Sequence, residues 1–174
     1  MIFLGPLRGE VRAASWFAAL GEPLTGGDIA EAQSYAGSDD DVVLVRSWPE
    51  AEAFLKTAEP AALAWWDREE RRRKELLAKA RARYPERALL TSLTELTTEA
   101  GDLVHGKAAT AAARLGNAAP ASIHVAAGAA SQAVYQLAVA RIAGDTASPF
   151  ESKFRLFAAG RWPLGVAGSR LVLF

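Results

Sequence analysis

The alternation of apolar and polar positions along the chain predicts a protein built mostly of helices. Apolar residues recur at helical spacing in several segments, and a capping residue, a proline or a glycine bounds each segment. The segment after residue 85 could be one helix or two, because Ser92 with Glu95 resembles a capping box. The predicted helices cover residues 7–20, 28–36, a segment that begins after Ser47, 58–83, 86–115, 120–143 and 149–159.

Helix starts and stops are marked most clearly at two places. Ser148 is followed by Pro149 in the first turn and by Glu151 at the capping-box position. Ser47 precedes Pro49 and Glu50 in the same arrangement. Both positions are therefore predicted to begin helices, and Asp28 with Glu31 is interpreted as a third, weaker capping box.

The segment 120–143 differs from the others because it is apolar nearly all round. Ile123, Val134 and Ile142 point in different directions on a helical wheel. A helix that is apolar on every side belongs in the interior of a fold. We therefore expect this helix at the centre of the protein, with its many alanines allowing other helices to approach closely.

Three short apolar stretches predict a small sheet that joins the ends of the chain. They cover residues 2–4, 42–45 and 170–174, and the last of them forms a hairpin from 164 to 174 that turns at 167–169. Three strands against a helical body are viable, whereas two alone are marginal. The predicted fold is mainly α: a single domain over 1–174, a bundle of about six helices with a minor β element near the termini.

Composition narrows the class of protein. The chain has no cysteine, which excludes disulfides and thiolate chemistry, and its net charge of zero gives no pull toward nucleic acid or an anionic membrane. The longest uncharged stretch, 115–140, is mostly alanine and contains Pro120, so we expect no membrane span and a soluble, cytoplasmic protein. Residues 1–60 carry ten acidic and four basic side chains, and we expect them beside the basic segments 61–87 and 149–174.

The charged stretch 67–79 resembles a nucleic-acid-binding surface only at first sight. Its acids precede its bases by four residues, the order that favours pairing along one exposed helix. A phosphate-binding helix would instead present unpaired basic residues on one face. The pairs are Asp67–Arg71, Glu69–Arg73, Glu70–Lys74 and Glu75–Lys79.

Candidate polar residues gather on the central helix. His124, Ser131 and Tyr135 fall within about 60° of one another, with Gln132 at their border. His105, on the preceding antiparallel helix, could reach them. Because buried polar groups need partners, the cluster is either a hydrogen-bond network that fixes helix register or a pocket for a small ligand or metal.

A second candidate lies on the preceding helix, where Glu95, Glu99, Asp102 and His105 are spaced by four, three and three residues. Glu99, Asp102 and His105 could supply metal ligands, as carboxylates and histidines do in metal-binding bundles. The alternative is an ordinary solvated face, because the carboxylates lie nearly opposite the apolar side of the helix.

No reactive motif accompanies these residues. The chain has no phosphate-binding loop, no H-E-x-x-H, no G-x-S-x-G and no EF-hand pattern, and we expect no cofactor. We therefore expect a non-enzymatic interaction or regulatory domain that self-associates, as a homodimer, through its alanine-rich or tryptophan-bearing helices, and that could have another protein partner. The alternative is a protein, or an enzyme, that binds a small molecule or a metal through His105, His124 and Tyr135.

Overall fold

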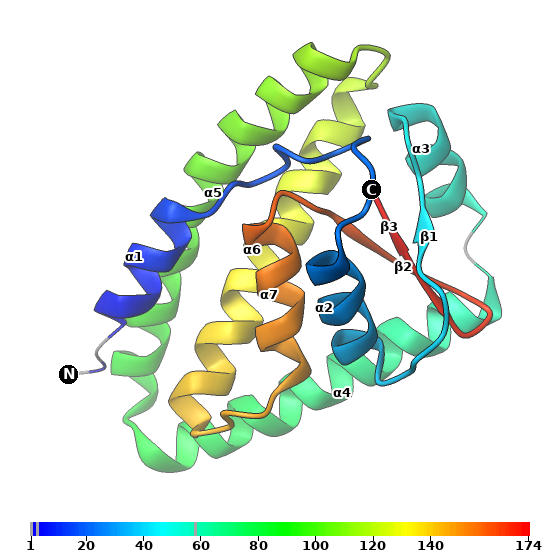
Figure 1. Cartoon of the computed structure of the whole chain (residues 1–174). Coiled ribbons are helices and arrows are strands. Elements are labelled where there is room, and N and C mark those ends of the chain that lie inside the picture. Colours follow the sequence, from blue (N-terminus) through cyan, green and yellow to red (C-terminus); the bar gives the residue numbers. More distant parts are fainter. Residues whose placement is uncertain (1, 3, 58) are drawn as a thin grey trace.

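A computed structural model describes residues 2, 4–57 and 59–174, and it shows a mainly α-helical chain with a small sheet (Figure 1). Within the part described, the order of elements is α1 (Gly5–Ala13), α2 (Gly26–Ala36), β1 (Val43–Leu44), α3 (Trp48–Lys56), α4 (Pro60–Arg83), α5 (Glu86–Leu115), α6 (Pro120–Ala143), α7 (Pro149–Ala158), β2 (Pro163–Ala167) and β3 (Arg170–Leu173). The predicted fold class is confirmed.

Side-chain caps begin three of the helices. The Ser47 hydroxyl accepts from the Glu50 amide, and the Ser148 hydroxyl accepts from the Phe150 amide, so both predicted starts are confirmed. The prediction for α2 was wrong, because the capping box is Thr25 with Asp28. The Asp28 amide donates to the Thr25 hydroxyl at 3.1 Å while the Thr25 amide donates to the Asp28 carboxylate at 2.8 Å. This reciprocal pair starts the helix at Gly26.

The predicted helix over 7–20 ends early, at Ala13. After it, Phe17 has a φ of 60°, which no helix tolerates. The Ser15 amide donates to the Ala158 carbonyl and the Ala19 amide to the Gly160 carbonyl, so this segment binds the end of α7 instead of continuing α1. Trp16 and Phe17 are buried as a result.

Two other boundaries differ from the predictions. Residues 86–115 form one continuous helix, because the Glu95 side chain accepts from Arg8 and does not cap a new helix. The helix predicted from residue 58 begins at Pro60, with Glu59 as its N-cap. Residue 58 lies outside the described residues, and Thr57 ends α3 rather than starting α4.

The sheet has the strand order β1-β3-β2, with β3 in the centre. β3 pairs in parallel with β1, where Val43 lies opposite Val172, and antiparallel with β2, where Val166 lies opposite Leu171. The predicted hairpin is thus confirmed. Ile2 and Leu4 lie outside the strands, and the remaining residue of the stretch 2–4 is not described, so β2 rather than this stretch supplies the third strand.

Helix α6 is most completely buried in its second half. It packs against α5, α4 and α7 (Figure 1), and residues 136–140 are all buried. Exposed residues in the stretch 120–132 include His124, Val125, Gly128 and Gln132. The expectation of a central helix therefore holds for the C-terminal half, while the predicted polar stripe begins on a water-facing side.

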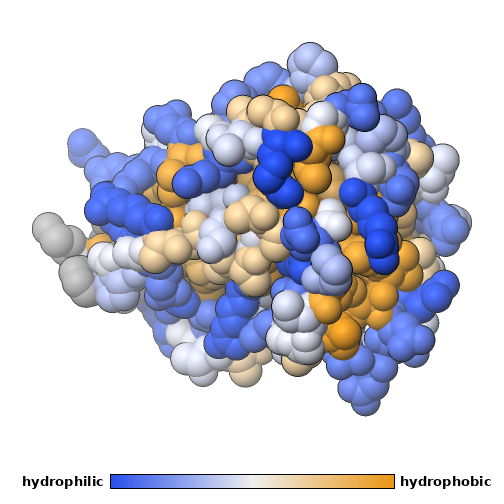
Figure 2. Space-filling view, turned by 45° about the horizontal axis from the view of Figure 1, so that its top comes forward, coloured by the Kyte–Doolittle hydropathy of each residue, from blue (hydrophilic) through white to orange (hydrophobic). Residues whose placement is uncertain are grey.

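The surface mixes charged and apolar residues without a single dominant patch in the view of Figure 2. Its broadest apolar area is on the right of that view, the side on which Figure 1 places the sheet and α3. The edge strand β1 is only half-buried. None of the helices in the described residues is long and apolar enough to cross a membrane. The cytoplasmic location expected from the sequence stays a prediction.

Candidate functional site

The structure brings the two histidines together. The imidazoles of His105 on α5 and His124 on α6 lie with ring centroids 5.0 Å apart and planes tilted by 35°. Both side chains are exposed. Ser131 packs against Gly101, one turn before His105, and therefore lies along the same seam between the two helices.

The other two candidates turn away from the histidines. The Tyr135 ring faces α4, where the Arg73 guanidinium lies 5.8 Å from its centroid. Gln132 lines a cavity between α4 and β2. Among the residues described, neither histidine nor Ser131 makes a side-chain hydrogen bond. The five residues therefore do not share one pocket, and the stripe is not an internal hydrogen-bond network.

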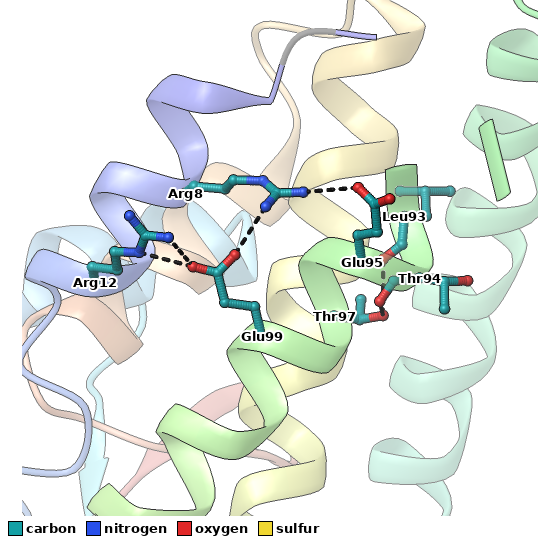
Figure 3. Close-up of polar contacts among 7 residues, drawn as sticks. All are labelled: Arg8, Arg12, Leu93, Thr94, Glu95, Thr97 and Glu99. Atoms are coloured by element: carbon teal, nitrogen blue, oxygen red, sulfur yellow. Dashed lines mark hydrogen bonds and ion pairs between the residues drawn. The ribbon is translucent and has the colours of Figure 1, made fainter. Parts of the chain in front are cut away.

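The acidic stripe on α5 binds another helix (Figure 3). Arg8 of α1 donates to Glu99 at 3.0 Å and to Glu95 at 3.2 Å, and Arg12 donates through Nε to the second Glu99 oxygen at 2.8 Å. Both Glu99 oxygens are thus occupied by guanidinium groups. No group of three His, Asp or Glu in the described parts of the chain is placed to hold a metal ion, so the geometry does not support a metal site on Glu99, Asp102 and His105.

Most of the predicted pairs along α4 are rearranged. Glu70 pairs with Lys74 as predicted, at 3.5 Å, and more closely with Arg73, at 2.6 Å. The hydrogen bonds from Arg73 lower the pKa of Glu70 to about 2. Glu69, which was predicted to pair with Arg73, instead points into the protein.

A buried polar cluster forms around Glu69. The Lys153 ammonium of α7 donates to the two Glu69 oxygens at 2.9 and 3.0 Å, and to Gln136 Oε1 of α6 at 3.0 Å. The Tyr35 hydroxyl of α2 donates to Glu69 at 2.5 Å. Lys153 is only 6% exposed. Four helices thus meet at one ion pair.

The protonation of this cluster follows from its burial. Burial raises the pKa of the Tyr35 hydroxyl well above its ordinary value of 10.0, and the negative charge of Glu69 raises it further. Tyr35 is therefore a neutral donor at physiological pH. All three Lys153 protons are used, whereas the buried Gln136 Nε2 has no hydrogen-bond partner among the described residues.

Beside the cluster is a cavity of about 160 Å³ between α4, α6 and β2. Its walls include the indoles of Trp65, Trp66 and Trp162, and Glu69 and Lys153 lie at its polar side. Val125 lines the cavity and is also 50% exposed, so the cavity reaches the surface there. We call it the tryptophan cavity.

A second cavity, of about 230 Å³, adjoins the tryptophan cavity. It shares Tyr35, Trp65 and Glu69 with the tryptophan cavity and adds Arg68 and Arg72 at its edge. The Arg68 guanidinium lies 5.2 Å from the centroid of the Trp65 ring. The aromatic side chains of this region are therefore already in contact with cations of the chain itself.

The sequence contains a signal for this site in the positions of its two charged residues. Glu69 lies seven residues from Ala62 and seven from Leu76, both buried, so it occupies the middle of the buried face of α4. Lys153 lies on α7 within about 60° of Phe150 and Phe157. A charged residue inside an apolar stripe needs a partner, and here the two supply each other.

Comparison with known proteins adds no further constraint. No family model, curated protein or solved structure matches the chain. The function is therefore argued from the site.

Proposed function

We propose that the protein binds a small, flat, uncharged molecule in the tryptophan cavity, and that it acts as a binding protein rather than as an enzyme. The observation that carries the proposal is a surface-connected cavity with three indole walls beside a buried, internally neutralised ion pair. Apolar walls with a few placed polar groups are the usual composition of ligand sites.

The charges favour a neutral ligand. Lys153 and Glu69 neutralise each other, and Lys153 has no free proton to offer. A ligand with a net charge would leave that charge unpaired in a partly desolvated site, which is costly. Glu69 Oε2 accepts a single hydrogen bond, from Lys153, so it can accept another from one ligand donor.

The size of the cavity sets the size of the ligand. An apolar cavity of about 150 Å³ is large enough for benzene, so a cavity of about 160 Å³ suits a single ring with a small donor group. Phenol has this shape and chemistry. A ligand with so few atoms is expected to bind with a Kd on the order of 0.1–1 mM.

Fluorine NMR on protein labelled with 5-fluorotryptophan tests the proposal. The chain has five tryptophans, and Trp16 does not line the tryptophan cavity and serves as an internal control. Titration with phenol should shift the resonances of Trp65, Trp66 and Trp162 saturably and leave that of Trp16 unchanged. Benzoate and benzylammonium, which carry a charge on a similar ring, should shift them far less.

Two results would oppose the proposal. One is the absence of any saturable shift of the cavity resonances at 10 mM phenol, which is about ten times the weakest expected Kd. The other is an equal response to phenol and to its charged analogues, because the argument from the neutral ion pair would then be wrong.

Self-association is a second proposal, but its support lies elsewhere than the sequence indicated. Trp16, Trp48 and Trp162 and the alanines of the second half of α6 are buried inside the chain. What supports it is the outer face of α5, where Leu90 is 46% exposed beside Thr91, Thr94 and Thr98.

A second copy of the chain suits this face because its acids are already neutralised. Glu95 and Glu99 pair with Arg8 of the same chain, so two copies of the α5 face could meet without like-charge repulsion. Light scattering after size exclusion should show a dimer at high protein concentration that Leu90→Asp converts to a monomer. A monomer at every concentration would refute this second proposal.

A further inference from the structure

Two imidazoles from different helices lie side by side at the surface of the α5–α6 pair. His105 and His124 have ring centroids 5.0 Å apart, and both side chains are exposed. In the described part of the chain neither is tied by a hydrogen bond to another side chain. Their ring nitrogens are therefore free to bind a common partner after small rotations of the side chains.

We propose that His105 and His124 together bind one divalent transition-metal ion, with Cu²⁺ preferred over Ni²⁺ and Zn²⁺. Neutral imidazole nitrogen is a good ligand for these three ions, and their affinities for such ligands peak at Cu²⁺. Metal–nitrogen distances are about 2.0–2.1 Å, so two nitrogens on one ion lie roughly 3 Å apart. Rings with centroids 5.0 Å apart can reach this spacing.

The surroundings leave the remaining coordination positions open. Gly106 follows His105 on α5, and Gly128 lies one turn after His124 on α6. A Cβ at either glycine would meet no atom within 4 Å, so the space beside these two glycines is open, and both histidine side chains are themselves exposed. Because no third His, Asp or Glu among the described residues completes a ligand group, water or a donor from another molecule would fill the other positions. Binding is then reversible and exchangeable.

This site is independent of the tryptophan cavity. Neither histidine lines that cavity, and Gln132 and Tyr135 face away from the imidazole pair. The metal site can therefore exist whether or not phenol binds, and the two proposals fail separately.

Metal binding should link the two helices and stabilise the folded protein. An ion that binds only the folded state raises its stability, and the gain is expected to be a Tm rise of about 3–6 °C at a Cu²⁺ concentration near ten times the Kd.

The test uses the untagged full chain with His105→Asn and His124→Asn as single variants. Both positions are exposed, so the substitutions should leave the fold intact, which circular dichroism checks. Copper titration followed by electron paramagnetic resonance should show one Cu²⁺ with two equatorial nitrogen ligands in the unaltered protein. Each variant should bind at least tenfold more weakly, with one nitrogen ligand or none.

Two outcomes would overturn the inference. If either variant bound Cu²⁺ as tightly as the unaltered protein, the ion would not be held by the pair. If the unaltered protein showed a single nitrogen ligand and no Tm rise at pH 7.5, the two imidazoles would not act together.

Discussion

Arg161 is a buried cation whose every N–H group has a partner. It is 2% exposed and donates to the Asp28 carboxylate through Nε and Nη2, at 3.2 and 3.0 Å. Its other protons go to backbone carbonyls of the segment between α1 and α2, those of Ala19, Glu22 and Pro23. This one side chain thus connects the residues between α7 and β2 with α2 and with the segment that precedes α2.

Replacement of this arginine should be among the most damaging single changes. Arg161→Ala leaves the buried Asp28 without its cation and three carbonyls without donors, which should lower the free energy of unfolding by about 3–5 kcal/mol. Arg155→Ala is the control, because Arg155 pairs with Glu31 at an exposed position and should cost less than about 1 kcal/mol. Urea denaturation measures both, and equal losses would contradict this account of Arg161.

Tyr35 makes stability depend on pH in the alkaline range. Its folded-state pKa is raised above the ordinary 10.0 by burial and by Glu69, so the folded protein keeps a proton that the unfolded chain loses. Its contribution is fully present below pH 10 and decreases as the pH rises above that value.

The Tyr35→Phe variant isolates this effect. Between pH 9 and 11 the free energy of unfolding of the unaltered protein should fall more steeply than that of the variant, because only the former must ionise a tyrosine on unfolding at this position. Denaturant unfolding at several pH values measures the two slopes. Identical slopes would show that Tyr35 titrates alike in both states.

At the scale of elements, the end of α7 requires a glycine for two reasons. Gly160 has a φ of 92°, and a Cβ there would lie 2.6 Å from the Ala19 amide nitrogen. Gly37, at the end of α2, has a φ of 67° but nothing within 4 Å of the same position. A side chain at Gly37 would therefore meet only backbone strain, whereas a side chain at Gly160 would meet backbone strain and a steric clash.

Alanine at these two sites should therefore have different costs. Gly37→Ala should lower the free energy of unfolding by about 1–2 kcal/mol, the cost of the left-handed conformation for alanine. Gly160→Ala should lose more, because the 15–20 segment must also move away from α7. Thermal and urea denaturation compare the variants, and a smaller loss for Gly160→Ala than for Gly37→Ala would refute the close approach.

Local signals predicted elements well where the cause was local. The caps at Ser47 and Ser148 and the C-terminal hairpin depend on neighbours in the sequence, and all three were found. Two of the errors have long-range causes. Residues 15–20 leave the helix because their amides bond near the end of α7, and α5 stays whole because Glu95 binds Arg8.

At the scale of the whole molecule, ion pairs join distant parts of the chain. The acidic N-terminal third lies beside the basic segment 149–174, because Asp28 pairs with Arg161 and Glu31 with Arg155, whereas Glu10 pairs with Arg141, outside both predicted basic segments. The hydrogen bond from Arg141 lowers the pKa of Glu10. The basic partners lie toward the C-terminus, whereas residues 61–87 provide none of these three.

Only part of the candidate site could be predicted from the sequence. The contact between His105 and His124 followed from two antiparallel helices and could be anticipated. The tryptophan cavity could not, because α2, α4, α6 and α7 meet at Glu69 only through the folded arrangement. The sequence marked Glu69 and Lys153 as charges on buried faces without indicating that each was the other's partner.

The most direct test of the ligand proposal fills the cavity and measures what is lost. Ala129 lines the tryptophan cavity from α6, whereas Ala121 lies on the exposed start of the same helix. Calorimetric titration with phenol should give a Kd on the order of 0.1–1 mM for the unaltered protein and for Ala121→Leu. It should show at least tenfold weaker binding for Ala129→Leu, while phenol binding to Ala129→Leu with undiminished affinity would contradict the account.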